Sequence, residues 1–97
     1  MPITEESVRR EARNLPEHMQ DGAIGYVLYG SLPGSFFTAV LCNNLIDAAT
    51  NADEQNKHAL YAWAVFVYNA VPMPARGSWG AISQWNREGG LLRGQRT

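Results

Sequence analysis

The amino-acid sequence predicts an all-α domain, a small bundle of four to five helices joined by short loops. Apolar residues recur three and four positions apart along most of the chain, which is the spacing of one helix face. No stretch alternates apolar and polar residues as a half-buried strand does. The 97 residues, of which 45% are hydrophobic, suffice for one core and not for two. We therefore expect a single domain over residues 1–97.

The first two helices are separated by a proline. Thr4 fits the N-cap of a helix, with Ile3 and Val8 as the apolar pair that staples its first turn. Pro16 disfavours helical geometry at Leu15. The first helix should therefore stop or kink there, and the second should begin with Pro16 in its first turn.

The stretch 30–49 organises the chain. Gly30 can end the second helix in left-handed geometry, and Pro33 suits the first turn of a new helix. Ser31 or Ser35 can accept hydrogen bonds from the first amides of that helix. The sequence thus predicts a sharp turn that leads into a third helix.

Asn44 falls within the apolar stripe of this predicted helix, between Val40 and Ala48. A buried amide without partners costs about 1–3 kcal/mol, so the position should have a defined role. Two interpretations remain open. Asn44 either ties the helix to a neighbouring backbone or contacts a ligand or partner.

The fourth predicted helix, over residues 53–71, is apolar on nearly every side. Asn51 followed by Glu54 resembles a capping box at its start. Such a helix is either central in its own domain or shared with another copy. The pattern therefore also fits a homo-oligomer.

A short last helix is predicted over residues 78–87. Prolines at positions 72 and 74 end the fourth helix, Ser78 suits the next N-cap, and a glycine pair at 89–90 stops the helix. Trp79 and Trp85 share one face, either packed on the domain or serving as a partly exposed aromatic anchor. We expect residues 91–97 to be a loose tail.

Motifs for catalysis and metal binding are missing from the sequence. It contains no phosphate loop with its lysine, no cysteine pair for zinc, no His-Glu metal motif and no nucleophile elbow. His18 and His58 have no companion at ligand spacing, and the single cysteine, Cys42, rules out an intrachain disulfide and favours a reducing compartment. We expect a protein that is not an enzyme and uses no cofactor or metal.

Charge and hydropathy favour the cytoplasm. The charged N-terminal residues lack the apolar stretch of a secretion signal. The apolar run Ala59–Tyr68 is too short to cross a membrane, which takes about 20 residues. The segment 76–97 carries net charge +3, so nucleic-acid binding through Arg76, Arg87, Arg93 and Arg96 stays open as a weaker alternative.

Candidate binding residues are polar or aromatic groups at helix starts and in loops. They are Ser31, Ser35, Asn43, Asn44, Asp47, Arg76, Ser78, Trp79 and Trp85. Helix starts offer free amides to anions, so these residues can hold a small anionic ligand such as a nucleotide. They can equally be ordinary helix caps.

Several short segments over residues 18–88 follow one another in a distinctive order: Asp21-Gly22, the block from Gly30 to Leu45, Ala52 to Asn56, Tyr68 to Pro72, and Gly77-Ser78-Trp79-Gly80. Together they resemble a family of short proteins encoded by tailed phages and prophages. Asn44 stands where the family pattern Asn-Asp-Leu has an acid, so a role of an acid at this position does not carry over. The family has no established activity, and the resemblance implies origin more than mechanism.

Small non-enzymatic phage proteins commonly act by binding a host component, an expectation that rests on analogy. The leading hypothesis is therefore a phage-type accessory protein that binds a host bacterial protein stoichiometrically and blocks or redirects it. Capture of a small anionic ligand is the second hypothesis, and nucleic-acid binding is the third.

Overall fold

Residues 2–93, the part of the chain that the computed structural model describes, form seven α-helices and one 3-10 helix and contain no strand. The elements in chain order are α1 (Glu5–Ala12), α2 (Glu17–Tyr29), α3 (Ser35–Leu41), α4 (Leu45–Asn51), α5 (Glu54–Lys57), α6 (Leu60–Ala70), the 3-10 helix η1 (Met73–Ala75) and α7 (Trp79–Glu88). The all-α prediction is confirmed. The predicted number of four to five helices is too low, because two of the predicted helices are each broken in two.

The start of α1 and the end of α2 follow the sequence signals, whereas α1 ends at Ala12, before the predicted Leu15, and Pro16 is the N-cap of α2 and not part of its first turn. Thr4 is the N-cap of α1, and its hydroxyl and that of Ser7 each accept a hydrogen bond from the other residue's amide. Pro16 directly precedes α2. Gly30 ends α2 with φ of 78°, the left-handed geometry that glycine adopts without steric cost.

The predicted third helix, which follows the turn in the stretch 30–49, is interrupted at Cys42–Asn44. Asn43 has φ of 61°, its amide donates to the Val40 carbonyl, and the Asn44 amide donates to the Ala39 carbonyl. These two bonds form a Schellman motif, which ends α3. The prediction of one continuous helix is wrong because asparagine tolerates this left-handed geometry and stops the helix there.

Two further predictions about this stretch are also wrong. Asn44 is exposed and is the N-cap of α4, where its Oδ1 accepts from the Asp47 amide at 3.1 Å. It therefore does not lie in a buried apolar stripe. Neither Ser31 nor Ser35 caps α3, since Gly34 occupies the N-cap position and no side chain bonds to the first amides.

The predicted helix over residues 53–71 is broken as well, at His58–Ala59 between α5 and α6. Asp53 caps α5 by accepting from the Asn56 amide at 2.8 Å. Asn51 is the last residue of α4, so the capping box predicted from Asn51 and Glu54 is not formed. A single aspartate therefore starts this segment.

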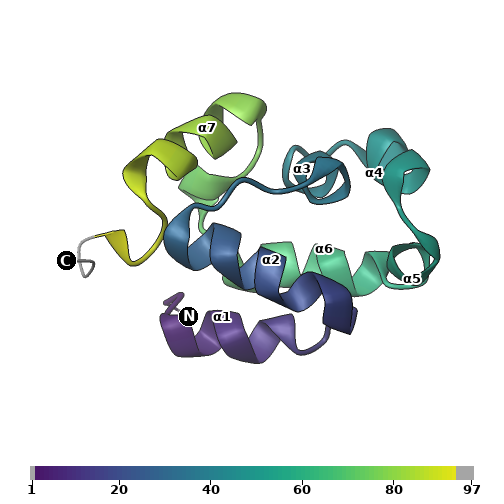
Figure 1. The fold of residues 1–97 in the computed structure, drawn as a ribbon, viewed down its shortest axis with the longest axis horizontal. Coiled ribbons are helices and arrows are strands. Elements are labelled where there is room, and N and C mark those ends of the chain that lie inside the picture. Colours follow the sequence, from purple (N-terminus) through teal and green to yellow (C-terminus); the bar gives the residue numbers. More distant parts are fainter. Residues whose placement is uncertain (1, 94–97) are drawn as a thin grey trace.

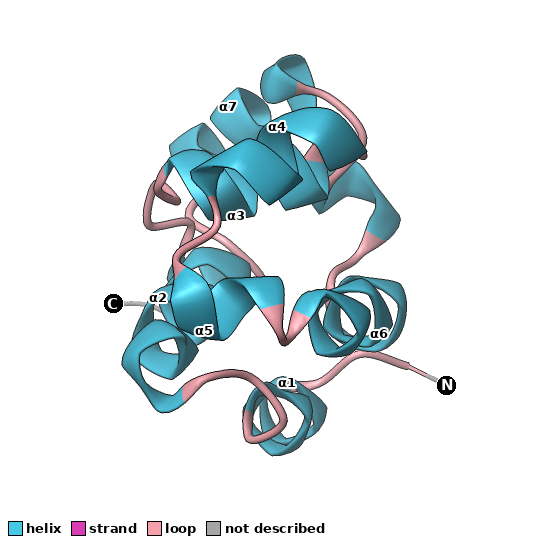
Figure 2. Cartoon of the chain, turned by 90° about the vertical axis from the view of Figure 1, so that its right-hand side faces the viewer, coloured by secondary structure: helices cyan, strands magenta, loops and turns pink. Residues whose placement is uncertain are grey.

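The helices are stacked in tiers (Figures 1 and 2). α1 lies on one outer side of the molecule and packs against α2 and α6, while α3, α4 and α7 lie on the opposite side. α3 packs against α4, α6 and α7. Buried rings of α2, α3 and α6 form the centre, with Phe37 and Trp63 4.9 Å apart between ring centroids.

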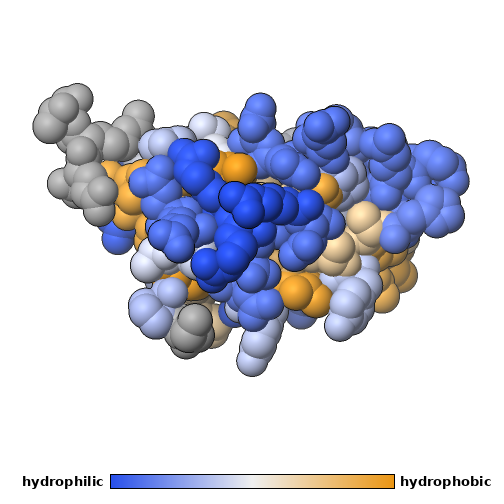
Figure 3. Space-filling view, turned by 90° about the horizontal axis from the view of Figure 1, so that it is seen from below, coloured by the Kyte–Doolittle hydropathy of each residue, from blue (hydrophilic) through white to orange (hydrophobic). Residues whose placement is uncertain are grey.

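The outer surface of α1 is hydrophilic. Seen from below, the molecule presents a largely polar face (Figure 3). The arginines of α1 form ion pairs one turn apart, Arg9 with Glu5 and Arg10 with Glu6, while Val8 is buried beneath. Such exposed pairs contribute little to stability, so burial of the other face holds α1 in place.

The C-terminal part packs more closely than expected. Ser78 caps α7 and Gly89 ends it in left-handed geometry, as predicted. The Leu91 and Leu92 amides donate to the carbonyls of Val27 and Leu28 at 2.8 and 3.0 Å, so the predicted loose tail does not begin at residue 91. The predicted tail residues 94–97 lie outside the described part. No described helix is long and apolar enough to cross a membrane.

Candidate functional site

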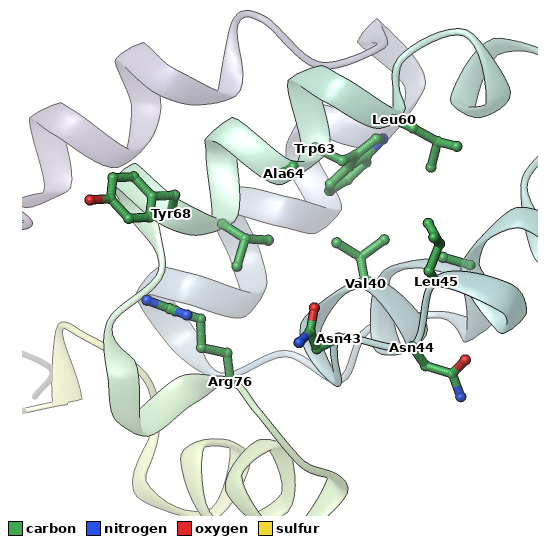
Figure 4. A pocket seen from close by; sticks show the side chains of 11 residues that line it. Val40, Asn43, Asn44, Leu45, Leu60, Trp63, Ala64, Tyr68 and Arg76 are labelled. Carbon is green, nitrogen blue, oxygen red and sulfur yellow. The ribbon is translucent and has the colours of Figure 1, made fainter.

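An open pocket of about 300 Å³ lies between α4 and α6 (Figure 4). Its lining residues are Val40, Asn43, Asn44, Leu45, Ala48, Leu60, Trp63, Ala64, Val67, Tyr68 and Arg76. We call it the α4–α6 pocket. Its volume is at the lower end of the range of about 300–1,000 Å³ that is common for ligand sites.

One wall of the pocket is a stripe of α6. Leu60, Trp63, Ala64, Val67 and Tyr68 are spaced like successive positions on one helix face. From Leu60 to Tyr68 the helix rises about 12 Å, at about 1.5 Å per residue. The wall is thus elongated and apolar, with a phenol at its far end.

The opposite wall comes from α3 and α4. Val40 and Leu45 point toward α6 across the pocket, and Leu60 faces Leu45 at one end (Figure 4). The side chain of Leu45 is 72% exposed although it lines the pocket. A large aliphatic side chain in water at the rim of an apolar pocket is typical of a binding surface.

Arg76 lies at the other end, beside Tyr68 (Figure 4). Its Nε donates to the Val71 carbonyl at 3.2 Å, and its Nη2 lies 3.1 Å from the Met73 sulfur. Among the described residues that line the pocket, Arg76 is the one with a charged side chain. Its guanidinium also takes no part in any ion pair formed among residues 2–93.

The two neighbouring asparagines point in different directions. Asn43 directs its amide into the pocket, while Asn44 points away from it (Figure 4). The Nδ2 of Asn44 donates to the Asp47 carboxylate at 2.9 Å, and this bond reinforces the cap of α4. Of these two asparagines, only Asn43 therefore has its side-chain amide available to an occupant of the pocket.

A second, more open pocket of about 400 Å³ lies beside the starts of α3 and α4. Ser35, Asn44, Asp47 and Trp79 of the candidate residues line it, together with Cys42. Burial raises the pKa of the Cys42 thiol, which favours the protonated, weakly nucleophilic form at neutral pH. The indole of Trp79 is 57% exposed and gives this pocket an aromatic edge.

Three candidate residues line neither pocket. Ser31 is exposed in the loop after α2, and Ser78 is the N-cap of α7. Trp85 is buried, with its Nε1 donating to the Tyr26 carbonyl at 3.0 Å. Trp85 is thus part of the core, and Trp79 alone of the two is available as an exposed aromatic anchor.

Two arginines of the C-terminal segment, Arg87 and Arg93, contact other side chains of the domain. The guanidinium of Arg87 donates to Ser83 and Gln84, and that of Arg93 lies 5.3 Å above the Trp85 ring. Arg96 lies outside the described residues.

The histidines pair with carboxylates. His18 lies 2.8 Å from Asp53, linking the start of α2 to the cap of α5, and His58 lies 3.3 Å from Glu54. Within residues 2–93 no group of three or more His, Cys, Asp or Glu side chains is placed to hold a metal ion.

The apolar lining of the α4–α6 pocket was not among the candidate residues. The spacing of Leu60, Trp63, Ala64 and Val67 is visible in the sequence but predicts a core face. No sequence pattern marks the pair Leu45-Ile46 as exposed, since consecutive residues can both face the core from one helix. Ile46 is 74% exposed.

Comparison of the chain with protein-family models, with curated proteins and with solved structures found no match.

Proposed function

We propose that this protein acts by stoichiometric binding to a partner protein, and that the α4–α6 pocket receives a segment of that partner. The observation that carries the proposal is an open apolar pocket flanked by two exposed large side chains, Leu45 at one end and Tyr68 at the other. Tyr68 is 79% exposed. Large exposed apolar groups around a concave surface are typical of protein interfaces.

The size of the pocket favours insertion of partner side chains. Its volume of about 300 Å³ corresponds to about ten water molecules at about 30 Å³ each. Transfer of a large aliphatic or aromatic side chain from water into such walls is worth about 1.5–3 kcal/mol. One or two buried anchors of this kind dominate the energy of many interfaces.

The chemistry of the lining supports binding over catalysis. Among residues 2–93, no serine, cysteine, histidine or carboxylate that could act as a nucleophile or a general base lines the pocket. The resemblance to short phage proteins suggests a bacterial host protein as the partner, blocked or redirected by the bound protein. We propose that this interaction takes place in the host cytoplasm.

A capture experiment tests the proposal with matched variants. Immobilised wild-type protein should retain a specific protein from bacterial lysate, and Leu45→Asp should abolish that retention because it places a charge at the pocket rim. Leu32→Asp is the control, since Leu32 is 60% exposed and lies outside the pocket. Equal retention by both variants, or no retained protein across several hosts, would contradict the proposal.

A second copy of the chain could also occupy the pocket, which is the homo-oligomer expected from the apolar helix. Light scattering at two concentrations measures the mass directly. If a wild-type dimer dissociates in Leu45→Asp and persists in Leu32→Asp, the partner is the protein itself.

Capture of a small anionic ligand is the second candidate function, and the charge of Arg76 in the pocket favours it. Ligand at 100 times its dissociation constant adds about 2.7 kcal/mol to stability. A thermal-shift screen with nucleotides should therefore raise the melting temperature of the wild type, and not that of Arg76→Gln. An unchanged melting temperature with every nucleotide removes this candidate.

A further inference from the structure

We infer that the α4–α6 pocket recognises an apolar residue together with an acidic side chain, and that Arg76 binds the carboxylate. The inference rests on the proposed function and adds the chemistry of the partner segment. The pocket has an apolar end at Leu45 and Leu60 and a cationic end at Arg76 (Figure 4). A matching segment therefore carries an aspartate or glutamate next to a large apolar residue.

The position of Arg76 is fixed before any partner binds. The Val71 carbonyl accepts from its Nε, and the Gly77 amide donates to the Leu41 carbonyl at 2.8 Å, which ties the adjoining loop to α3. A guanidinium has five N–H donors, so others remain for a carboxylate after these contacts. Less conformational entropy is lost on binding because the side chain is already held.

The charge of Arg76 is not neutralised within residues 2–93. No carboxylate lines the pocket, and no ion pair includes this side chain. Arg76 is half-buried beside apolar walls, where the lower effective dielectric strengthens its attraction for an anion. Charge complementarity thus selects an acidic occupant over a neutral or basic one.

Asn43 adds a second polar contact between the two ends. Its left-handed φ of 61° is maintained by the Schellman motif, and its amide projects into the pocket (Figure 4). The amide can donate to a carboxylate oxygen or accept from the segment's backbone. It gives the pocket a polar group that does not change the net charge.

The pocket matches a carboxylate better than a phosphate. A phosphate group carries charge near −2 with three strong acceptor oxygens, whereas the lining supplies one cation and mainly apolar surface. The exposed side chains of Leu45 and Tyr68 lie at opposite ends, so a chain can continue past the pocket in both directions. We therefore assign the carboxylate to a side chain within a segment and not to a chain terminus.

Short probes test this inference without the natural partner. The blocked dipeptides acetyl-Leu-Glu-amide and acetyl-Leu-Gln-amide differ only in charge, and acetyl-Gln-Leu with a free carboxyl end represents a chain terminus. Binding is followed by NMR at low salt through the Trp63 indole N–H and the pocket backbone amides. The glutamate probe should bind about three- to tenfold more tightly than the glutamine probe, as for a charge-assisted hydrogen bond.

Variants at the cationic end complete the test. Arg76→Gln should bring the two affinities together, and Arg76→Lys should retain part of the preference. Tyr68→Glu places an internal carboxylate beside Arg76 and should weaken only the acidic probes, while Tyr68→Gln is its neutral control. A two-dimensional amide spectrum verifies the fold of each variant.

The outcomes separate the two proposals. Neutral and acidic probes that bind the wild-type pocket equally overturn the role of Arg76 and leave protein binding at the pocket intact. If Arg76→Gln still prefers the glutamate probe over the glutamine probe, the role of Arg76 is likewise overturned. If the probe with the free carboxyl end binds more tightly than the glutamate probe, the site recognises a chain terminus, and the side-chain assignment is overturned. If no probe shifts a pocket resonance, the inference fails. If Leu45→Asp retains the lysate protein as well as the wild type does, the proposed function itself is rejected.

Discussion

The indole Nε1 of Trp63 donates a hydrogen bond of 2.9 Å to the Oδ1 of Asn56, and both side chains are buried. The bond joins α5 to α6 across the break between them. Trp63 also lines the α4–α6 pocket, so this pair fixes one of its walls. A buried polar pair of this kind orients an otherwise apolar core.

Removal of the acceptor should destabilise the protein. We expect Asn56→Ala to lower the free energy of unfolding by about 1–3 kcal/mol, because the indole N–H then stays buried without a partner. Urea denaturation measures the change. Asn69→Ala, at an exposed position of α6, is the control and should stay within about 0.5 kcal/mol of wild type. An equal decrease in the free energy of unfolding in both variants would mean that the buried hydrogen bond does not contribute to stability beyond an ordinary surface contact.

Substitutions at Asn43 should separate its backbone role from its side-chain role. Alanine strongly disfavours φ near 61°, so Asn43→Ala should cost about 1–2 kcal/mol in the free energy of unfolding. Asn43→Gly should be neutral or stabilising, because glycine adopts this geometry freely. Thermal and urea unfolding compare the two, and an equally stable Asn43→Ala would show that the Schellman motif does not depend on this residue.

Gly90 should not tolerate a side chain. A Cβ at this position would lie 2.5 Å from backbone atoms of Leu28 and Tyr29, and φ is +83°. Overpacking costs about 1–3 kcal/mol and left-handed geometry about 1–2 more, so Gly90→Ala should lose at least about 2 kcal/mol in the free energy of unfolding. Gly22→Ala is the matched control within α2, where a Cβ meets nothing within 4 Å.

That control should itself gain up to about 1 kcal/mol from the higher helix propensity of alanine. Loss of stability in Gly22→Ala, or none in Gly90→Ala, would contradict the close approach of the C-terminal segment to α2. Chemical denaturation of both variants under the same conditions provides the comparison.

Acid should weaken the start of α5. The amide of Asn56 and then the side chain of His18 hydrogen-bond the Asp53 carboxylate, which lowers its pKa below 3.8. A lowered pKa in the folded state means that the stabilisation is present above the unfolded pKa and is lost as the pH falls through the folded pKa. Asp53→Asn keeps a good N-cap without the charge. Its urea midpoint should therefore fall less than that of wild type between pH 5 and pH 3.

If the urea midpoint falls equally in wild type and Asp53→Asn between pH 5 and pH 3, the Asp53 carboxylate does not govern the loss of stability in acid. At pH 7 the two proteins should differ mainly by the loss of the contact with His18.

Local signals predicted several helix ends correctly. Thr4, Gly30, Ser78 and Gly89 each act within one turn of the chain, so their neighbours in sequence are sufficient to assign their roles. The Asn43-Asn44 break is also local. The sequence pattern does not reveal this break, because asparagine is compatible with both a helix and a left-handed stop. The capping bonds between Asn44 and Asp47 are evident only in the structure.

The sequence by itself determined the helical class and the apolar stripe along residues 60–67, because periodicity and turn chemistry act between near neighbours. The tertiary structure alone decided that Arg76 lies at the end of that stripe and that Trp85 lies in the core while Trp79 stays exposed. Periodicity shows which side chains share a face. Which of those faces is covered depends on contacts between residues far apart in the chain, such as Leu41 with Gly77 and Val27 with Leu91.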